Sequence, residues 1–311
     1  MGKVRAVCIS EKRGTQKKNI ESAVFVENWG IEGDAHAGNW HRQISLLSEE
    51  TIAAFKARGA EVTDGAFGEN LVVSGYDFTK FPVGTRFTCK DVVLELTQIG
   101  KECHHGCEIF QKMGDCIMPR EGVFTRVLKG GEIKAGDEIT MLPLEKDRPF
   151  TAAIITLSDK GAAGEREDKS GPLIQEMLMK EGYDVIETLL LPDGEQPLKH
   201  QLMRLADQRQ VNVIFTTGGT GFAERDVTPE ATQAVCDRMA MGIADAIRQY
   251  SLSITGRAML SRAVSGIRKK TLIVNLPGSP KAVKESLEYV LPQLGHGLGI
   301  LRGTDGECGN S

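Results

Sequence analysis

The chain has 311 residues, of which 41% are hydrophobic and 26% are charged. These proportions are typical of globular proteins and exclude a disordered, collagenous or low-complexity chain, and the length predicts about two domains. Lys and Arg together number 38 against 42 for Asp and Glu, which gives a net charge of -4. That balance excludes a generally basic nucleic-acid-binding protein and gives no sign of a membrane-surface protein.

Neither a membrane span nor a signal peptide is predicted. No run approaches the roughly 18 consecutive apolar residues that a spanning helix needs, and the start of the chain lacks the apolar core of a signal peptide. We therefore expect a cytoplasmic protein. Its seven cysteines, an odd number in a chain without an export signal, favour thiols over a disulfide framework.

In the first half, the apolar runs are short, rich in β-branched residues and separated by glycine-containing turns. Such a pattern predicts strands, here over residues 4–9, 23–26, 43–47, 70–73, 86–89, 92–97 and 138–142. One helix interrupts them, with Ser48 as its predicted N-cap and Gly59 as its stop. We expect a mostly-β barrel domain over residues 1–142.

Two prolines and several charges without apolar periodicity mark a linker over 143–150, and the pattern then changes. Strands are predicted over 152–157, 184–191, 211–217 and 272–276, alternating with helices over 170–181 and 197–208 and from residues 228 and 280. Ser170 and Thr228 are the predicted N-caps of two of these helices. Alternating strands and helices build a mainly parallel sheet covered on both faces. We expect a three-layer α/β domain over 151–303 and a flexible tail over 304–311.

A glycine-rich turn follows the predicted strand 211–217. It lies at the carboxyl end of a parallel strand, the edge at which open α/β sheets bind ligands, and consists of Thr217, Gly218, Gly219, Thr220 and Gly221. Glycine lets backbone amides approach an anion closely and threonine hydroxyls add donors, so the turn predicts a phosphate site. A turn without a ligand is the alternative. Neither G-x-G-x-x-G nor G-x-x-x-x-G-K-[ST] fits, which disfavours a dinucleotide-binding dehydrogenase and a P-loop NTPase.

Two aspartates follow strands at the same expected edge. Asp226 comes five residues after the glycine turn, and Asp193 follows strand 184–191. One or two carboxylates together with substrate phosphates are the usual ligands of Mg²⁺. Each aspartate alone is also compatible with a local turn cap.

Several motifs in the second half resemble the molybdopterin adenylyltransferase family. They are SD at 158–159, EDKSG at 167–171, TGGTG at 217–221, RDVTPEAT at 225–232, LSR at 260–262 and NLPGSPK at 275–281, and the match extends over residues 151–302. The resemblance implies the transfer of AMP from Mg-ATP to molybdopterin with release of pyrophosphate. It also implies a homo-oligomer, because that family tends to form trimers.

By this resemblance, Asp193 and Asp226 are the catalytic carboxylates and the Mg²⁺ ligands. The residues implied to bind the pterin phosphate and the nucleotide are Thr217, Gly218, Gly219, Thr220, Gly221, Ser158, Asp159, Asn275, Pro277, Gly278 and Ser279. For residues 275–280, a Pro-Gly strand cap without a ligand is an alternative. Because the reaction brings several negative charges together, catalysis is expected to consist mainly of positioning and charge neutralisation.

The first half holds a cysteine- and histidine-rich stretch over residues 100–107, followed by Cys116. A thiolate needs a nearby positive charge at neutral pH, and the candidate cations are Lys101, His104, His105 and Arg120. Three interpretations compete. They are a structural zinc site that uses Cys103 and Cys107, buried inert thiols, and a reactive cysteine.

The third interpretation rests on a second resemblance. GIEGDAHAG at 30–38, RQISLL at 42–47, GAFGENL at 65–71, VG at 83–84 and Cys103 resemble, in that order, the MOSC domain family over residues 1 to about 142. This resemblance implies a β-barrel in which Cys103 is the catalytic cysteine and either carries sulfane sulfur or ligates molybdenum, for which a soft thiolate is suited. The polar residues that would then bind the pterin or its phosphate, or else belong to a solvated loop, are His36, Arg42, Asn70 and Arg120.

Together the two resemblances imply a bifunctional protein of molybdenum cofactor biosynthesis. The expected small molecules are Mg²⁺, ATP, molybdopterin and, on the barrel domain, molybdenum cofactor. The expected partners are other cofactor-maturation proteins or molybdoenzymes. Two alternatives stay open: a molybdopterin carrier without catalysis, and a barrel that uses molybdenum to reduce N-hydroxylated compounds. The presence of both Asp193 and Asp226 favours an enzyme over a carrier.

Overall fold

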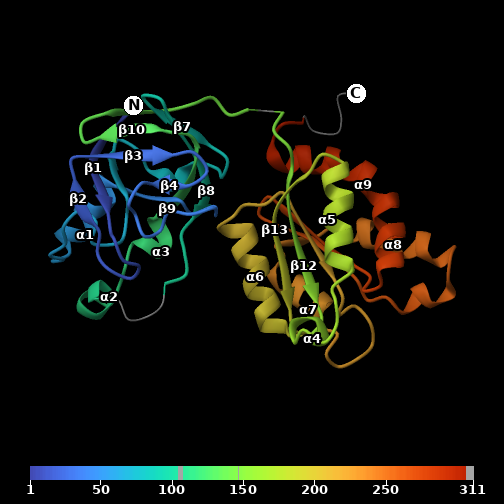
Figure 1. The fold of residues 1–311 in the computed structure, drawn as a ribbon. Coiled ribbons are helices and arrows are strands. Elements are labelled where there is room, and N and C mark those ends of the chain that lie inside the picture. The colour runs from blue at the N-terminus through green and yellow to red at the C-terminus, as the bar shows by residue number, and fades with distance from the viewer. Residues whose placement is uncertain (104–107, 146, 306–311) are drawn as a thin grey trace. The chain divides into compact units, whose positions relative to one another are not determined.

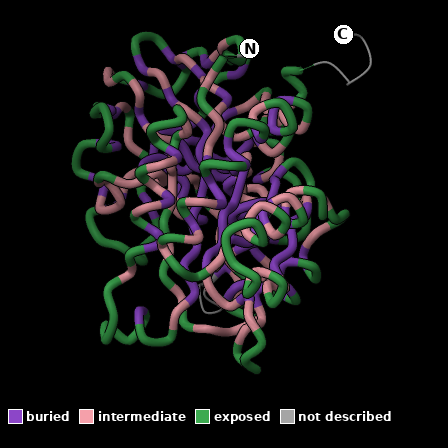
Figure 2. The backbone as a smooth tube through the Cα atoms, turned by 90° about the vertical axis from the view of Figure 1, so that its right-hand side faces the viewer, coloured by how far each residue is buried: buried purple, intermediate pink, exposed green. Residues whose placement is uncertain are grey.

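The computed structural model describes residues 1–103, 108–145 and 147–305. The chain divides into two compact units, Met1–Glu145 and Lys146–Ser311 (Figure 1). Buried residues gather along the strands, and exposed residues dominate the loops (Figure 2). Every helix in the described ranges is too short or too polar to span a lipid bilayer.

The first unit is a β-barrel, as expected. An eight-stranded sheet has the order β11-β7-β8-β9-β5-β6-β1-β2, and β11 also pairs with β1, which closes it. A three-stranded sheet has the order β10-β3-β4. The strands are β1 (Gly2–Ile9), β2 (Lys18–Ile20), β3 (Ser22–Val26), β4 (Gly30–Ile31), β5 (Ile44–Ser48), β6 (Leu71–Ser74), β7 (Arg86–Cys89), β8 (Val92–Ile99), β9 (Val123–Lys129), β10 (Gly131–Lys134) and β11 (Glu138–Met141).

Helices pack on the outside of the barrel wall. Ile52 and Phe55 of α1 (Glu49–Ala57) and Met118 of α3 (Met118–Glu121) belong to an apolar cluster separate from the one that fills the barrel interior. The other helical segments are α2 (Glu108–Met113) and the 3₁₀ helix η1 (Phe78–Lys80). The prediction of a single helix in this half is therefore wrong. The additional helices have at most six residues, which is too short for a helical period to show in the sequence.

The second unit contains one six-stranded sheet with the order β13-β12-β14-β17-β16-β15. Its first four strands are parallel, and β16 pairs antiparallel with both β17 and β15. The strands are β12 (Thr151–Leu157), β13 (Asp184–Leu191), β14 (Val213–Thr217), β15 (Arg238–Met239), β16 (Ser265–Arg268) and β17 (Thr271–Leu276). The helices are α4 (Asp159–Ala162), α5 (Ser170–Lys180), α6 (Glu195–Asp207), α7 (Thr228–Val235), α8 (Met241–Leu252), η2 (Gly256–Leu260) and α9 (Pro280–Arg302).

Helices cover both faces of this sheet (Figure 1). Because side chains alternate along a strand, Ile154 of β12 packs with α5, α8 and α9, whereas the adjacent Ile155 packs with α6 and α7. The result is three layers around a mainly parallel sheet, which confirms the predicted fold class.

The predicted N-caps of α5 and α7 are wrong. Ser170 and Thr228 are the first residues of these helices rather than their caps. Asp168 occupies the capping role at α5, since its Oδ1 accepts from the backbone N–H groups of Ser170 and Gly171. The freed hydroxyls reach neighbouring loops instead: Ser170 Oγ donates to the Gly278 carbonyl, and Thr228 Oγ1 to the Gly218 carbonyl.

Candidate active site

Several loops converge at one edge of the sheet in the second unit. Strands β12, β13, β14 and β17 run in the same direction, so that Leu157 lies beside Leu191 and Thr217 beside Leu276 at their carboxyl ends. The loops that follow these strands carry most of the residues predicted to bind substrate and metal. This is the edge at which open α/β sheets bind ligands.

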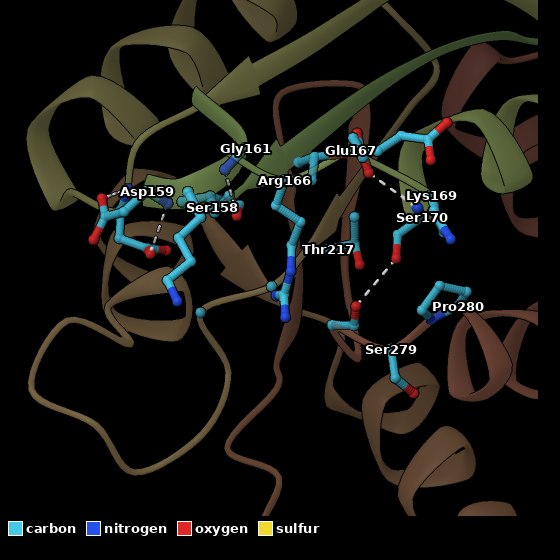
Figure 3. Close-up of a pocket in the computed structure, with 18 of the residues that line it drawn as sticks. Ser158, Asp159, Gly161, Arg166, Glu167, Lys169, Ser170, Thr217, Ser279 and Pro280 are labelled. Atoms are coloured by element: carbon cyan, nitrogen blue, oxygen red, sulfur yellow. Dashed lines mark hydrogen bonds between the residues drawn. The ribbon is translucent and has the colours of Figure 1, made fainter. Parts of the chain in front are cut away.

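A cavity of about 1030 Å³ opens at this edge (Figure 3). Small-molecule sites span roughly 300–1,000 Å³, so this volume lies at the upper end of that range. The predicted residues that line it are Ser158, Asp159, Asp193, Thr217, Gly218, Gly219, Asp226, Gly278 and Ser279. In Figure 3, Asp159 lies to one side, Thr217 and Ser279 lie to the other, and Arg166 extends between them.

The glycine turn needs glycine at two positions. Gly218 has φ +95°, and a Cβ there would lie 2.4 Å from the Leu157 carbonyl oxygen. Gly219 has φ +64°, and a Cβ there would lie 2.4 Å from Thr228 Oγ1. The turn therefore packs closely against β12 and α7, and it presents bare backbone to the cavity.

Three carboxylates lie close together at the cavity wall. The Asp193 N–H donates to Asp159 Oδ1 (2.9 Å), and the Asp159 N–H donates to Asp193 Oδ2 (3.3 Å). Asp226 Oδ2 accepts from the Ala223 N–H (2.9 Å). One cation accompanies them, because Arg225 Nε lies 4.0 Å from Asp193 Oδ2.

The electrostatics of Asp193 fit a bound cation. Burial raises the pKa of its carboxyl, and the negative charges of Asp159 and Asp226 raise it further, against lowering contributions from the Asp159 backbone N–H and Arg225. The side chain is only 11% exposed, so its negative charge is incompletely balanced by the protein. Two carboxylates in such a setting suit Mg²⁺ whose other ligands come from substrate phosphates and water. The described part of the chain has no cluster of three or more His, Cys, Asp or Glu arranged to hold a metal.

Sequence reasoning missed several polar groups of this cavity. Four cationic side chains line it, namely Lys160, Arg166, Lys169 and Arg225. Lys169 and Arg225 fall inside the quoted motifs, whereas nothing in the sequence pointed to Lys160 or Arg166. The hydroxyl of Thr156 also lines the cavity, is buried and has no hydrogen-bond partner among the described residues. A buried hydroxyl in that state is available to a ligand.

Four predicted residues are not among those that line the cavity: Thr220, Gly221, Asn275 and Pro277. Asn275 is fully buried. Its Nδ2 donates to the hydroxyls of Thr216 and Thr232 (both 2.9 Å), and its Oδ1 accepts from the Val264 N–H (3.2 Å). The amide therefore ties β17 to β14 and α7 inside the protein.

A second cavity, of about 720 Å³, lies within the first unit and contains Cys103. No Asp or Glu is among its described lining residues, whose polar members include His36, Arg42, Ser45, Asn70, Lys101 and Cys116. The Arg42 guanidinium lies 4.8 Å from the ring centroid of Trp40 and 5.6 Å from that of Phe124. A cavity that combines cations, aromatic rings and a thiol suits an anionic heterocycle.

A buried polar cluster around Asp34 is linked by hydrogen bonds to His36 and Asn70, which line this cavity. Asp34 accepts from the His36 backbone N–H (2.7 Å), from Lys17 Nζ and from Asn70 Nδ2. Burial alone would raise the pKa of Asp34, but the hydrogen bonds from His36 and Lys17 hold it well below its usual range. Asn70 Nδ2 also donates to the Cys8 carbonyl (3.0 Å).

The remaining predicted residues of the first unit lie elsewhere. Arg120 pairs with Asp115 (2.9 Å) and is not among the residues that line the second cavity. His104, His105 and Cys107 lie outside the described residues, and so does the zinc site that would use Cys107.

The two units thus define a class of protein: an α/β unit with a phosphate-suited cavity, joined to a barrel with a thiol in a cationic cavity. Comparison with protein families agrees. Residues 153–296 match the family described as the probable molybdopterin binding domain, and residues 33–140 match the MOSC domain.

Individual relatives match the second unit. The molybdopterin adenylyltransferase of Haemophilus influenzae is 44% identical over 147 residues, which cover 47% of this chain and 75% of the relative. The Escherichia coli K12 enzyme of the same name is 43% identical over 140 residues, covering 44% and 71%. The crystal structure of the molybdopterin biosynthesis enzyme MoaB from Thermus thermophilus shares 46% identity, with coverage of 50% and 97% and a TM-score of 0.48.

The chain belongs to the molybdopterin adenylyltransferase family through its second unit, and its first unit is a MOSC domain. It is accordingly a protein of molybdenum cofactor biosynthesis, and this kinship implies ATP and molybdopterin as substrates.

Proposed function

We propose that the second unit transfers AMP from Mg-ATP to the phosphate of molybdopterin and releases pyrophosphate. The observation that supports this most is the make-up of the 1030 Å³ cavity. Its walls combine a glycine turn with four cationic side chains and with five carboxylates, among them those of Asp193 and Asp226. The glycine turn suits the pterin phosphate, the carboxylates suit a divalent cation, and the cationic side chains suit the triphosphate of ATP.

In the proposed reaction, a phosphate oxygen of molybdopterin attacks the α-phosphorus of ATP. The bond between that phosphorus and the bridging oxygen of pyrophosphate breaks, and pyrophosphate leaves. Both reactants are anions, so the protein contributes mainly by positioning them and by balancing their charge. Gly218, Gly219 and Ser279 would orient the pterin phosphate, and Lys160 and Arg166 would face the triphosphate. Mg²⁺ held by Asp193 and Asp226 would supply further charge neutralisation at the nucleotide phosphates.

Pyrophosphate release separates this enzyme from a non-catalytic carrier. Purified full-length protein with Mg²⁺, ATP and saturating molybdopterin should release pyrophosphate only when all three are present. Retained molybdopterin binding without pyrophosphate release would contradict the enzyme and support the carrier.

We also propose that Cys103 in the MOSC domain carries sulfur or ligates molybdenum. The supporting observation is its place in a cavity with Arg42 and Lys101 and without an acidic residue in the described lining. Stoichiometric molybdenum that is lost in Cys103→Ala but kept in Cys236→Ala would support ligation, whereas cyanide-releasable sulfur with the same dependence would support a sulfur carrier. If neither differs between the two variants, the proposal fails. Reduction of an N-hydroxylated compound by molybdenum-loaded protein would favour the reductase alternative.

A further inference from the structure

The LSR motif at 260–262 has no part in the reaction as proposed above. Arg262 follows η2 and lies against the loop that joins β14 to α7. This loop begins with the glycine turn and ends next to Asp226. Arg262 is not among the residues that line the 1030 Å³ cavity, so any effect on the reaction must be exerted through other residues.

Arg262 bonds to the loop at three points and to α7 at a fourth. Its backbone N–H donates to the Thr220 carbonyl (3.0 Å), and its Nε donates to the Gly221 carbonyl (2.7 Å). Its Nη2 donates to the Asp226 carbonyl, and its Nη1 pairs with Glu230 in the first turn of α7. One side chain therefore fastens the start of the loop, its carboxylate-bearing end and the helix that follows.

The segment between these points is held mainly by local bonds, together with the ion pair between Arg225 and Asp193. Residues 222–225 are exposed, with Phe222 at 72%. The described bonds of this segment close a small turn, in which Asp226 and Ala223 bond through N–H to carbonyl (2.9 Å) and through N–H to carboxylate (2.9 Å). Such a turn keeps its own shape, and the pair between the exposed Arg225 and Asp193, at 4.0 Å, is only a weak tie between the turn and Asp193.

Arg262 is itself held in place. Arg248 of α8 donates from Nε to the Ser261 carbonyl (3.2 Å) and from Nη2 to the Ala263 carbonyl (2.8 Å), on either side of Arg262. A helix outside the cavity thus anchors the segment that anchors the loop.

We infer that Arg262 is a positioning residue for Asp226, which it holds at the distance from Asp193 and the glycine turn that a Mg-nucleotide complex requires. This inference rests on the proposed function. The planar guanidinium carries donors in several fixed directions and bonds to three acceptors at once, whereas a lysine ammonium is a compact charge on a flexible stem. Arg262→Lys should therefore restore only part of the function of Arg262.

The test compares Arg262→Ala and Arg262→Lys with Arg268→Ala. Arg268 is a matched control, since its guanidinium also bonds to a carboxylate, Asp207, and to a backbone carbonyl, that of Val235, and both of these partners lie outside the loop that joins β14 to α7. In the full-length protein we would measure the melting temperature, kcat, KM for molybdopterin and the Mg²⁺ concentration for half-maximal rate. Calorimetric binding of a non-hydrolysable ATP analogue, with Mg²⁺ and with EDTA, gives a readout independent of turnover.

Arg262→Ala should lower kcat by about 10- to 100-fold, the scale of a misplaced catalytic group, and should raise the half-saturating Mg²⁺ concentration. It should weaken binding of the analogue with Mg²⁺ but not with EDTA. Arg262→Lys should fall between wild type and Arg262→Ala, and Arg268→Ala should lower the melting temperature while leaving kcat and Mg²⁺ dependence unchanged.

Two results would overturn the inference. The first is a folded Arg262→Ala variant whose Mg²⁺ dependence and analogue binding are the same as in wild type. The second is an Arg268→Ala variant that loses as much kcat as Arg262→Ala when both are destabilised to the same extent. That result would mean that Arg262 only stabilises the fold. If Arg262→Ala does not fold, Arg262→Lys and Glu230→Gln supply the same comparison. A wild-type protein without turnover would refute the proposed function, yet analogue binding would still decide the role of Arg262.

Discussion

At the scale of single residues, Asp226 and Asp193 are the groups on which the proposed reaction depends most. Replacement of either by alanine removes charge that the Mg-nucleotide needs but leaves the glycine turn intact. We expect kcat to fall by about 10²–10³-fold, in the range seen when one electrostatic group is lost, while KM for molybdopterin changes little. Steady-state kinetics of each variant checks this.

Asp184→Ala is the control for these variants. Asp184 is an exposed carboxylate at the opposite end of β13 from Asp193, and its loss should leave kcat unchanged. If Asp193→Ala or Asp226→Ala instead raises KM for molybdopterin and leaves kcat unchanged, these residues bind the pterin rather than assist the transfer.

Asp193 should also destabilise the folded protein in the absence of a cation. Because the fold raises the pKa of its carboxyl, Asp193 binds a proton more readily in the native state than in the unfolded chain. The free energy of unfolding therefore falls as the pH rises from the pKa of Asp193 in the unfolded chain to its pKa in the native state. Asp193→Asn should therefore melt above wild type at pH 8 without Mg²⁺, by ~1–3 °C. The difference should vanish at a pH below both values.

Melting curves from about pH 3 to pH 8, without Mg²⁺, test this prediction, because the lower limit lies below the ordinary pKa of an aspartate. A variant that melts below wild type at pH 8 would show that the carboxylate stabilises the fold through Arg225 and the Asp159 backbone, and would remove the argument for a poorly balanced charge.

The sequence predicts the aspartates of the site better than its cations. Asp193 and Asp226 each follow a strongly apolar strand, so their arrival at one sheet edge is a consequence of topology. Lys160 lies in the four-residue helix α4, which is too short for a helical period to show, and Arg166 lies in the irregular segment that follows it. Asn275 is predicted to bind substrate because it also lies near the end of a parallel strand. In the structure its amide is hydrogen-bonded to Thr216, Thr232 and Val264 inside the protein.

At the scale of elements, the glycine turn between β14 and α7 sets the shape of the cavity wall. In Gly218→Ala the new Cβ meets the Leu157 carbonyl at 2.4 Å, in addition to the unfavourable positive φ. We expect the turn to shift and molybdopterin affinity to fall by at least about tenfold, that is ~1.4 kcal/mol. Titration of molybdopterin into the variant measures this.

Gly182→Ala is the matched control for the turn. Gly182 follows α5 with φ +81° and nothing lies within 4 Å of a Cβ there, so it bears the cost of the left-handed conformation alone, ~1–2 kcal/mol. It should lose stability but not molybdopterin affinity. Equal affinities in the two alanine variants would contradict a direct role of the turn in binding.

Helices and strands that contain long apolar runs can be predicted from the sequence, whereas elements with few buried apolar residues cannot. The parallel strands β12, β14 and β17 are buried on both faces and appear as continuous apolar stretches. Strand β13 lies at the edge of the sheet and is partly exposed, but its run of apolar residues still marks it as a strand. By contrast, β15 has two exposed residues and β16 contains Gly266, so neither resembles a strand. Helix α8 buries only Ala244 and Ile247, which leaves too weak an apolar stripe for its twelve residues to be recognised.

At the scale of the whole molecule, each unit has apolar clusters of its own. The barrel interior includes Phe87, whose ring lies 5.3–5.6 Å from those of Tyr76, Phe78 and Phe81. Phe87→Ala should destabilise the first unit by ~3–5 kcal/mol and leave pyrophosphate release by the second unit unchanged below the melting temperature of the first.

Differential scanning calorimetry of the full chain, combined with the pyrophosphate assay, checks this independence. Two transitions are expected, of which only one moves in Phe87→Ala; Ile154→Ala should move the other. Loss of pyrophosphate release in step with the barrel transition would show instead that the two units fold or act as one.

In the proposed function, the second unit adenylylates molybdopterin by means of its two aspartates. The most direct measurement uses ATP labelled at the α-phosphate and follows the label after reaction with molybdopterin and Mg²⁺. The label should move onto the pterin in an amount equal to the pyrophosphate released. This transfer should be as fast in Asp184→Ala as in wild type and about 10²–10³-fold slower in Asp226→Ala. Label that stays entirely in nucleotide with the wild-type protein, although molybdopterin is bound, would contradict it.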